Sequence, residues 1–481
     1  MPRPHLPLEN RYTLLIYAHI MSSRRDFIKT AGTLAVASAI PSIGSAHTAA
    51  SKNPQLSLKG MKVNVDSQWD VIVVGGGPAG CTAAISAARE GARTLLIEAM
   101  GQLGGMGTAG MVPAWCPFSD KEKIIYRGLA EKIFNLSRAG VPHEPKNRLD
   151  WVNINPEHLM RVYDQQVAAS GAKVLFFSRL AAVEKNAQDQ VDAIIVANKN
   201  GLTAFKAKVY VDATGDGDLA AWAGADTLKT DVLQSSTLCF SLANVDTYAF
   251  RYDSPNLQSD DPNTPINKGI ADGRYPKSMG HICLNLVGPD VVQFNAGHID
   301  TDATDPWKLS LAMQEGRQLA EQFLKAFQEV SPKAFGNAFL VKTASLLGVR
   351  DSRRVVGDYL FTGDDWRARR QFDDEIGRNC YYIDIHKSGA VPVFYKKGES
   401  HGIPYRCLTP KGLKNVLVAG RCISTDEEAF GSLRVMPPCL VTGEAAGMAA
   451  YHAIQQGHCD VHKVDTQHLR ARLKEEGQYF L

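Results

Sequence analysis

Residues Trp69–Gly80 read WDVIVVGGGPAG, a short apolar run that passes directly into glycines. The VIVV run is β-branched and unbroken by polar residues, which is typical of a strand buried on both faces of a parallel sheet. After the glycines, Cys81–Gly91 has the Ala-rich composition of a helix, and Thr94–Ile97 forms a second apolar run that ends in Glu98. This order of strand, glycine turn, helix, strand and acidic residue predicts a dinucleotide-binding unit.

The glycines of this turn have separate predicted roles. Gly75 makes the tight turn, Gly77 lets the backbone approach a pyrophosphate, and Gly80 lets the helix pack closely on the strand. The N-terminus of the helix directs free N–H groups and a positive dipole end at the phosphates, and Glu98 is placed to accept hydrogen bonds from a ribose. The residues predicted to contact the nucleotide are Gly75, Gly77, Pro78, Ala79, Gly80 and Glu98. The alternative is a glycine-rich turn with a purely structural role.

A second segment, Gly105–Gly110, has the same glycine spacing, but no strand leads into it. As a separate site it is better interpreted as a flexible loop. It belongs to the glycine-rich stretch Met100–Pro117, for which two interpretations stay open. The stretch, including Gly104 and Gly105, either runs past a bound cofactor or only connects two elements.

The composition is that of a globular protein. Of the 481 residues, 44% are hydrophobic and 21% are charged, and the length favours two or three lobes. The net charge of +3 comes without a basic stripe, so no nucleic-acid partner is predicted, and no apolar run of about 18 residues predicts a stable membrane span. The nine cysteines form no C-x-x-C or C-x₄-C pair, which excludes the redox couple of a disulfide reductase.

The N-terminal region resembles a twin-arginine signal peptide. Ser23–Lys29, SRRDFIK, precedes the small-residue run Ala31–Ile40, with cleavage expected after Ala46. This predicts a periplasmic protein, exported already folded by the twin-arginine (Tat) machinery, with its cofactor loaded beforehand. Met21 lies where such a signal normally begins, so residues 1–20 are expected to reflect a start codon placed too early. The alternative is an amphipathic or disordered arm with a chance Arg pair.

Two later apolar runs also end in glycine and polar residues. Val209–Val211 leads into DATGDGD, and Val416–Ala419 leads into Gly420 and Arg421. The carboxyl ends of parallel strands are the edge where such sheets bind ligands; an Asx-rich turn is the alternative for the first. Residues 240–340 differ in character and contain the amphipathic segment Trp307–Glu329, which predicts a separate lobe made of a β-sheet with a helix on it.

Taken together, seven motifs give the chain a recognisable resemblance. They are VVGGGPAG (73–80), LGGMGTAG (103–110), VDATGDGDLA (211–220), GVRDSRRVVGDY (348–359), IDIH (383–386), IPYRCL (403–408) and LVAGRCIS…GSLRVMPPC (417–439). On these residues the chain resembles the FAD-dependent oxidoreductases with a glutathione-reductase-type FAD domain, which are distantly related to fumarate reductase-like flavoproteins. The resemblance covers roughly residues 68–475.

The resemblance implies an α/β fold, with a Rossmann-like FAD-binding domain and an inserted α+β substrate or cap lobe. It implies FAD as the cofactor, with Gly215 and Asp216 beside the nucleotide half and Gly420 and Arg421 approaching the flavin end. The expected domains are the N-terminal extension with the signal peptide (1–46), the first part of the FAD-binding domain (67–240), the substrate lobe (241–405) and the C-terminal part of the FAD-binding domain (406–475).

The flavin end has one supporting feature and one departure from the family pattern. A helix that begins near Met436 aims its positive end at the mouth of the sheet, and together with Arg434 it would favour reduction of the flavin. After Ser424, where relatives are expected to carry a His, this chain has Asp-Glu-Glu. Either Glu427 replaces that His or the proton-transfer step differs here.

The candidate general base is His386. It follows Asp384 on a predicted strand, so both side chains lie on the same face, and a His oriented by a carboxylate is a suitable base. A structural His is the alternative. The other catalytic candidates are Arg350, Arg353 and Arg434. Arg350, Arg353 and Arg354 form either a clamp for a polar substrate or an interlobe salt-bridge network with Asp351, Asp358 and Asp364. His281, His298 and His401 are treated as isolated, and no metal site is predicted.

The predicted function is an exported FAD-dependent oxidoreductase that passes a hydride from a small polar organic substrate to flavin N5. His386 would act as base and the arginines would position the substrate. A quinone, a cytochrome or oxygen would reoxidise the flavin, because only one dinucleotide fingerprint has its full context. Two alternatives stay open: a flavin-dependent isomerase or hydratase without net redox, and a non-catalytic flavin-binding protein.

Overall fold

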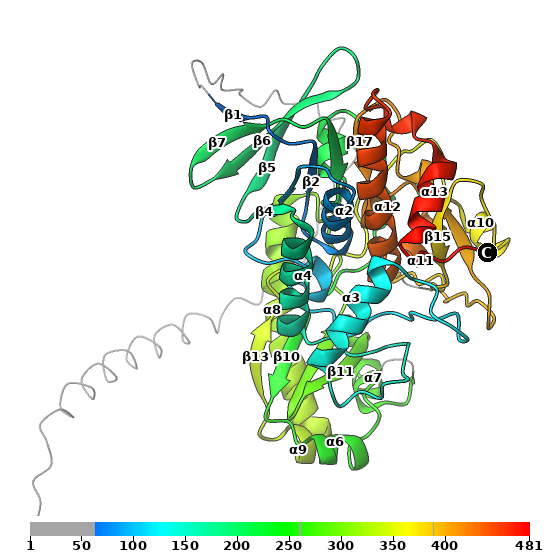
Figure 1. Ribbon diagram of the computed structural model, residues 1–481. Helices are drawn as coiled ribbons and strands as arrows, with labels where there is room; N and C mark the ends of the chain where they lie inside the picture. The colour runs from blue at the N-terminus through cyan, green and yellow to red at the C-terminus, as the bar shows by residue number, and fades with distance from the viewer. Residues whose placement is uncertain (1–62, 259–260, 388) are drawn as a thin grey trace, which may run out of the picture. The chain divides into compact units, whose positions relative to one another are not determined.

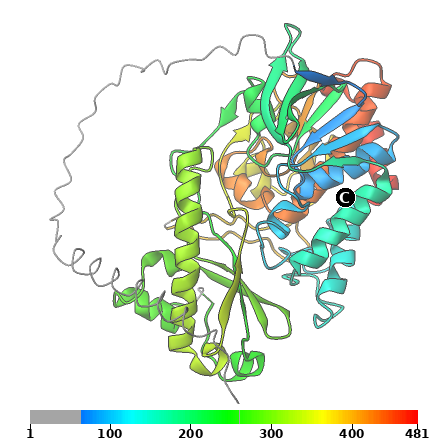
Figure 2. The same ribbon diagram turned by 90° about the vertical axis from the view of Figure 1, so that its left-hand side faces the viewer.

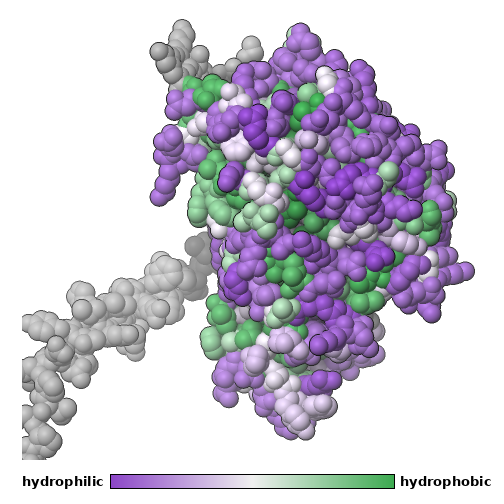
Figure 3. All heavy atoms as spheres, viewed as in Figure 1, coloured by the Kyte–Doolittle hydropathy of each residue, from purple (hydrophilic) through white to green (hydrophobic). Residues whose placement is uncertain are grey.

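The computed structural model describes residues 63–258, 261–387 and 389–481. The predicted signal peptide and the 1–46 extension lie outside these residues. Across the described ranges, no helix combines the length and apolar character needed to cross a membrane. The face shown in Figure 3 is largely hydrophilic, with apolar side chains gathered in small groups.

A five-stranded parallel sheet lies at the centre of the nucleotide-binding part, in the order β17-β8-β2-β3-β4. Its strands are Val416–Val418, Val209–Asp212, Val71–Val74, Thr94–Ile97 and Lys173–Leu175 respectively. Strand β2 pairs with β3 on one side and with β8 on the other, and all its residues are buried. The predicted α/β fold with a parallel sheet is confirmed, and the VIVV run forms its central strand.

Helices α2 (Pro78–Arg89) and α12 (Met436–Gln455) lie side by side against this sheet (Figure 1). Their backbones approach closely, since a Cβ atom on Gly443 would lie 2.1 Å from the carbonyl oxygen of Ala79. The helices are also joined by Thr82, whose Oγ1 donates to the Leu440 carbonyl at 2.8 Å. Residues from opposite ends of the described chain therefore form one packed unit.

A second sheet follows the order β1-β7-β6-β5. Strands β5 (Arg179–Lys185), β6 (Val191–Asn198) and β7 (Gly201–Phe205) form an antiparallel meander, and β1 (Asn64–Asp66) pairs parallel to β7. The meander interrupts the chain between β4 and β8 of the central sheet.

The lobe is built on a four-stranded antiparallel sheet in the order β11-β12-β10-β13. These strands are Ile282–Gly288, Val291–Ala296, Phe240–Ala243 and Phe339–Thr343. The long helix α8 (Pro306–Val330) runs alongside the sheet, as Figure 2 shows, and buries phenylalanines against it. The stacked rings of Phe240 and Phe294, with centroids 4.9 Å apart, lie in this core.

The lobe's own core ends earlier than position 405, where the sequence placed its boundary. Val349 is the last member of the lobe's hydrophobic cluster, whereas Val355 and Phe361 belong to the core around the central sheet. The segment after Val349 leaves the lobe because the hairpin of β15 (Glu375–Asn379) and β16 (His401–Pro404) packs on α12. The short pair of β14 (Arg354–Val355) with β9 (Thr227–Leu228) returns the chain to the nucleotide-binding part.

The remaining helices are short or lie at the periphery of the sheets described above. They are α3 (Leu129–Ser137), α4 (Pro156–Ser170), α5 (Asp218–Trp222), α6 (Thr247–Tyr252), α7 (Pro265–Ala271), α9 (Pro332–Phe335), α10 (Gly363–Arg367), α11 (Glu427–Leu433) and α13 (Thr466–Glu475).

Candidate functional site

The glycine turn after β2 forms a cradle with open space at its centre. Gly75 has a φ of +99°, and a Cβ atom there would lie 2.4 Å from the carbonyl oxygen of Ala213. A Cβ on Gly80 would lie 1.7 Å from the carbonyl oxygen of Gly75. At Gly77, by contrast, a Cβ would meet no protein atom within 4 Å. Because α2 begins at Pro78 without a side-chain cap, its first N–H groups are available to an anion in that space.

Glu98 is fixed at the edge of the cradle by two backbone hydrogen bonds. Its carboxylate accepts from the N–H of Gly76 at 2.6 Å and from the N–H of Met100 at 2.7 Å. Burial raises the pKa of Glu98, and these hydrogen bonds act against that effect. The acidic residue at the end of the second strand thus lies next to the glycine turn.

The second glycine segment lies directly on the first. The N–H of Gly104 donates to the Gly76 carbonyl at 2.8 Å, and a Cβ on Gly105 would lie 3.0 Å from the Cα of Gly77. Of the two interpretations of this loop, the geometry supports the one in which it runs past the nucleotide position. A Cβ on Gly107 would lie 3.1 Å from the sulfur of Met436, so the loop also contacts the first residue of α12.

The ends of β8 and β17 complete the cradle. Arg421 pairs with the Asp216 carboxylate at 2.9 Å and lies 3.0 Å from the position of a Cβ on Gly215. Gly420 lies against Ala79 at the start of α2, where a Cβ on Gly420 would be 2.9 Å from the Ala79 Cβ. The residues predicted to bind the cofactor therefore surround one region of the fold.

Beside the cradle, His386 and Asp384 are in contact. His386 Nε2 lies 3.2 Å from Asp384 Oδ2, and the same carboxylate accepts from Arg434 Nη2 and Tyr381 Oη, each at 3.2 Å. Arg434 is two residues before Met436, so this contact adjoins the mouth of the cradle. Burial raises the pKa of Asp384, but the hydrogen bond from His386 and the charge of Arg434 outweigh it and hold that pKa below its usual range.

The ionised carboxylate settles the tautomer of His386. An ionised carboxylate can only accept, so Nε2 of His386 carries the proton and Nδ1 has the lone pair. Burial, followed by the charge of Arg350, lowers the pKa of His386 to about 3 despite the opposing effect of Asp384. At neutral pH the imidazole is therefore uncharged and able to accept a proton at Nδ1.

Two further histidines, which the sequence analysis treated as isolated, meet His386. Its Nδ1 lies 3.1 Å from Nε2 of His298, and the rings of His298 and His281 are parallel with centroids 4.9 Å apart. Burial lowers the pKa of His298 to about 4 and that of His281 well below its usual value. We call His281, His298 and His386, with Asp384, Arg350 and Arg434, the histidine cluster.

The pairing of β11 with β12 brings His281 and His298 together. His281 precedes β11 and His298 follows β12, and the Gly297 N–H donates to the His281 carbonyl at 2.7 Å. Both residues flank the open end of the hairpin that β11 and β12 form. Spacing along the chain did not reveal the cluster, since the partner His386 comes from a different part of the fold.

Arg350 belongs to the cluster, but its neighbours in sequence do not. Its guanidinium donates to the Ser235 carbonyl at 2.7 Å and to Thr237 Oγ1 at 2.8 Å, and it lies 3.3 Å from His281 Nε2. Burial lowers the pKa of Arg350 to about 10, so the side chain stays charged at neutral pH. Arg350 also donates to Asn295 Oδ1 at 3.2 Å and forms no ion pair among the described residues. One ring nitrogen each of His281, His298 and His386 lies within 4.8 Å of the others, a spacing that could hold a metal ion, but the charge of Arg350 next to His281 acts against one.

The predicted arginine clamp does not form. Arg353 pairs with Asp218 and donates to the Asp216 carbonyl, whereas Arg354 lies over the ring of Phe430. Although close in sequence, the three arginine side chains contact different parts of the fold. Arg353 thus lies with Asp218 and not beside Arg350, and among the described residues none of the three arginines pairs with Asp351, Asp358 or Asp364, the alternative network.

Glu427, proposed as a substitute for a missing His, pairs instead with Lys387. The neighbouring Asp426 caps α11 by accepting from the N–H of Ala429. Glu427 is therefore paired with Lys387, the residue that follows His386. The imidazoles that lie beside His386 are those of His281 and His298.

The cradle and the cluster together fit a large bound cofactor. Buried polar atoms around the cluster have no hydrogen-bond partner in the described ranges, namely Arg434 Nε, Gln234 Nε2, Ser236 Oγ and Asp351 Oδ1. Such atoms are rare in protein interiors and mark places where another group binds. The open space at Gly77 is a second observation of the same kind.

Comparison with known proteins agrees with this geometry. The profile of the family "FAD dependent oxidoreductase" matches residues 70–473. The mitochondrial dihydrolipoyl dehydrogenase of Schizosaccharomyces pombe is 28% identical over 194 residues, which cover 38% of this chain and 35% of that protein. A digeranylgeranylglycerophospholipid reductase of Methanocella arvoryzae is 29% identical over 185 residues, covering 34% and 43% respectively.

These curated relatives are matched over less than half of their own length. Among solved structures, a geranylgeranyl bacteriochlorophyll reductase-like protein from Thermoplasma acidophilum aligns over 86% of this chain and 85% of that one. The identity is 14% and the TM-score is 0.45.

Proposed function

Because the chain belongs to the FAD dependent oxidoreductase family, we propose that it is a dehydrogenase that oxidises a small polar organic substrate at the histidine cluster. The contact of His386 Nε2 with Asp384 Oδ2 at 3.2 Å carries this proposal. Bound FAD would supply the acceptor for a hydride, which carries the two electrons of the oxidation. The chain's own residues must then hold the substrate and take up its proton.

The cradle would hold FAD through groups already in position. The space at Gly77 and the N-terminus of α2 suit the pyrophosphate, and Glu98 suits the adenosine ribose. Gly420 and Arg421 would approach the flavin end. Arg434 and the N-terminus of α12 place positive charge there, which favours the reduced cofactor.

His386 is the proposed general base. Its Nδ1 would take the proton of the substrate hydroxyl or carbon as the hydride leaves, replacing its present contact with His298. Asp384 holds the ring through Nε2 and stabilises the imidazolium that forms. His386 is unprotonated at physiological pH, as a base must be, and its lowered pKa makes it a weaker base than a free imidazole.

The two arginines of the cluster act on the substrate oxygen. With neutral imidazoles, Arg350 and Arg434 outweigh the single carboxylate of Asp384, so the cluster carries net positive charge. This charge stabilises the negative charge that develops on the oxygen as its proton leaves. Since Arg350 is buried and already held by backbone and side-chain acceptors, it is preorganised for this role.

The export route and the electron acceptor are also proposals. The sequence at Ser23–Ala46 supports twin-arginine export to the periplasm, where a quinone, a cytochrome or oxygen would accept the electrons. Fusing residues 1–50 to a reporter that matures only after folded export tests the route. A reporter that stays inside the cell, or a fusion that is unaffected by an R24K/R25K double substitution, would contradict it.

Anaerobic mixing of the oxidised holoprotein with sugars, polyols and carboxylic acids tests the dehydrogenase function. Loss of flavin absorbance on adding one of these classes is expected, with H386A slowing it by about a hundredfold or more. The exposed His143, changed to Ala, is the matched control and leaves the rate unchanged. Turnover of a compound without loss of absorbance would favour an isomerase or hydratase, and absence of both would favour a binding protein.

A further inference from the structure

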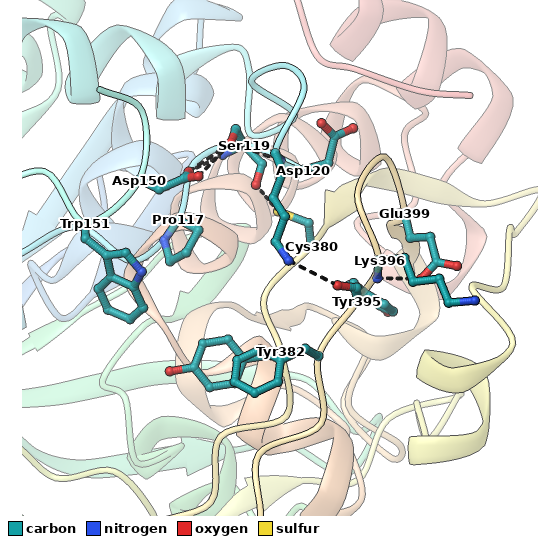
Figure 4. Close-up of a pocket in the computed structure, with 12 residues that line it drawn as sticks. Pro117, Ser119, Asp120, Asp150, Trp151, Cys380, Tyr382, Tyr395, Lys396 and Glu399 are labelled. Atoms are coloured by element: carbon teal, nitrogen blue, oxygen red, sulfur yellow. Dashed lines mark hydrogen bonds between the residues drawn. The ribbon is translucent and has the colours of Figure 1, made fainter. Parts of the chain in front are cut away.

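A surface cavity of about 280 Å³ lies beside the histidine cluster and has no role in the function proposed above. Its apolar lining comes from Pro117, Trp151, Cys380, Tyr382, Phe394 and Tyr395. Figure 4 shows the rings of Trp151 and Tyr382 beside Pro117 on one side, with Lys396 and Glu399 on the opposite side. We call this cavity the aromatic pocket. Its volume is that of a site for about one six-membered ring with its substituents.

Two rings of the aromatic pocket are open to solvent. Phe394 is 60% exposed and Trp151 is 37% exposed, whereas Tyr395 is buried. The ring of Tyr382 packs on Phe394 with centroids 4.6 Å apart, which fixes the pair in place. Fixed aromatic faces at an open cavity are typical of ligand sites.

The buried side chain of Tyr381 lies behind the pocket lining and contacts two of the pocket's rings as well as the histidine cluster. Its ring lies 6.4 Å from that of Trp151 and 4.3 Å from that of Tyr382, measured between centroids. Its hydroxyl donates to Asp384 Oδ2 at 3.2 Å, on the side of His386. The pocket and the proposed general base are therefore linked through the contacts of one tyrosine side chain.

The charged groups of the pocket do not attract an anionic ligand. Asp120, Asp150 and Glu399 line it against two amines, Lys121 and Lys396. These carboxylates are already engaged: Asp150 accepts from the Ser119 hydroxyl at 2.8 Å, and Glu399 pairs with Arg369 at 2.7 Å. With Arg369 counted beside Glu399, the three carboxylates meet three cations, so the pocket offers an anion no net attraction. A wholly apolar chain would leave these charged groups without water or a polar partner.

A neutral ring with apolar faces and polar edges can pack on the aromatic side chains of the lining and form hydrogen bonds with its charged groups. We propose that the aromatic pocket binds one sugar ring of a saccharide, and that it is a subsite for the part of the substrate that does not react. The C–H face of the sugar would pack on Trp151 and Tyr382, and its hydroxyls would reach Asp150 and Lys121. This inference rests on the proposed dehydrogenase function, since it places the reacting unit of the same saccharide at His386.

Calorimetric titration of the oxidised holoprotein with cellotriose, maltotriose and xylotriose tests this subsite. At least one trisaccharide is expected to bind, with W151A and Y382A each weakening its affinity about tenfold. W151F, which keeps an aromatic face, is expected to retain most of the affinity. W307A is the matched control, because Trp307 is 81% exposed on α8 and lies outside the pocket lining. The flavin spectrum of every variant verifies its fold.

The outcomes separate this inference from the proposed function. Binding of phenol or benzoate in place of every saccharide would overturn the sugar assignment, as would W151A and Y382A proteins that bind saccharides like the parent. If saccharides bind in a Trp151-dependent way but no compound bleaches the flavin, the subsite stands and the dehydrogenase function fails. If a monosaccharide bleaches the flavin and neither pocket variant alters saccharide binding, the function stands and the subsite fails.

Discussion

Asp384 accepts a hydrogen bond from Nε2 of His386 at 3.2 Å, and this one contact determines which ring nitrogen is available to a substrate. The carboxylate is held on its other sides by Arg434 and Tyr381. It is thereby fixed in its ionised form, and the lone pair of His386 is confined to Nδ1.

Asp384→Asn should show how much His386 depends on the negative charge of Asp384, as distinct from the shape of that side chain. The amide keeps the shape of the side chain, but its NH₂ group can donate to His386 and so stabilise the wrong tautomer, as in other His-carboxylate pairs. We expect the rate constant for flavin reduction to fall by about 10² to 10⁴. Stopped-flow anaerobic reduction measures it, and Asp364→Asn, at a residue whose side chain is 95% exposed, is the control. An unchanged rate in Asp384→Asn would remove Asp384 from the mechanism.

The low pKa values of the cluster predict a rate that is insensitive to pH around neutrality. His386, with a pKa of about 3, and His298, with a pKa of about 4, stay neutral from pH 8 down to about pH 5. Flavin reduction should therefore be level over that range and fall only as pH approaches 4 and below. A rate that halves near pH 6.5 would show that His386 titrates as an ordinary exposed histidine.

The same shifts predict a loss of stability in acid. Because the pKa of His298 is lower in the folded state than its unfolded value near 6.5, its contribution is fully present above pH 6.5 and declines as pH falls towards 4. From pH 7.5 to pH 5 this amounts to about 2 kcal/mol of unfolding free energy. His298→Gln, compared with the parent by urea denaturation at both pH values, should lose less stability by about that amount. An equal loss in both proteins would contradict the shift.

Gly77→Ala should lower the FAD content without unfolding the chain. A Cβ atom at Gly77 meets no protein atom within 4 Å, so the folded apoprotein has room for it, whereas the pyrophosphate would not. We expect a lower ratio of flavin absorbance to protein absorbance, with an apoprotein melting temperature close to that of the parent. Gly288→Ala, at another open position without a positive φ, is the control. Full FAD occupancy in Gly77→Ala would place the pyrophosphate elsewhere.

Gly443→Ala, unlike Gly77→Ala, should destabilise the apoprotein itself. Its Cβ would lie 2.1 Å from the Ala79 carbonyl oxygen, so α12 must move away from α2. We expect a loss of about 1–3 kcal/mol in the unfolding free energy of the apoprotein, measured by urea denaturation, and weaker FAD binding as a consequence. Stability equal to that of the Gly288→Ala control would show that the two helices can separate at no cost.

The sequence predicted the nucleotide unit well because its signals are local. A buried run followed by Gly75, Gly77 and Gly80 permits few structures, and the helix predicted at Met436–Gln455 has those bounds in the fold. Of the histidine cluster, the sequence singled out His386 with Asp384, Arg350 and Arg434, but not the other two histidines. Residues His281 and His298 are brought to it by strand pairing, which single-residue patterns do not encode.

The errors have physical causes of the same kind. Arg353 looked like a partner of Arg350 because the two are close in sequence, but only the tertiary fold shows that Asp218 is its neighbour. The lobe boundary was placed at 405 because nothing in the chain near Val349 marks a linker. The hairpin of β15 and β16 packs on α12, a contact between segments far apart in sequence.

The contact of α2 with α12 gives the nucleotide site a consequence for biosynthesis. Gly75, Gly77 and Gly80 form the first wall of the cradle, whereas Gly420, Met436 and Gly443 follow far later in the chain and leave the ribosome long after them. Contacts between such distant segments cannot form before both have emerged. We therefore expect the cradle to be complete, and able to hold FAD, only after the chain has been synthesised beyond Gly443.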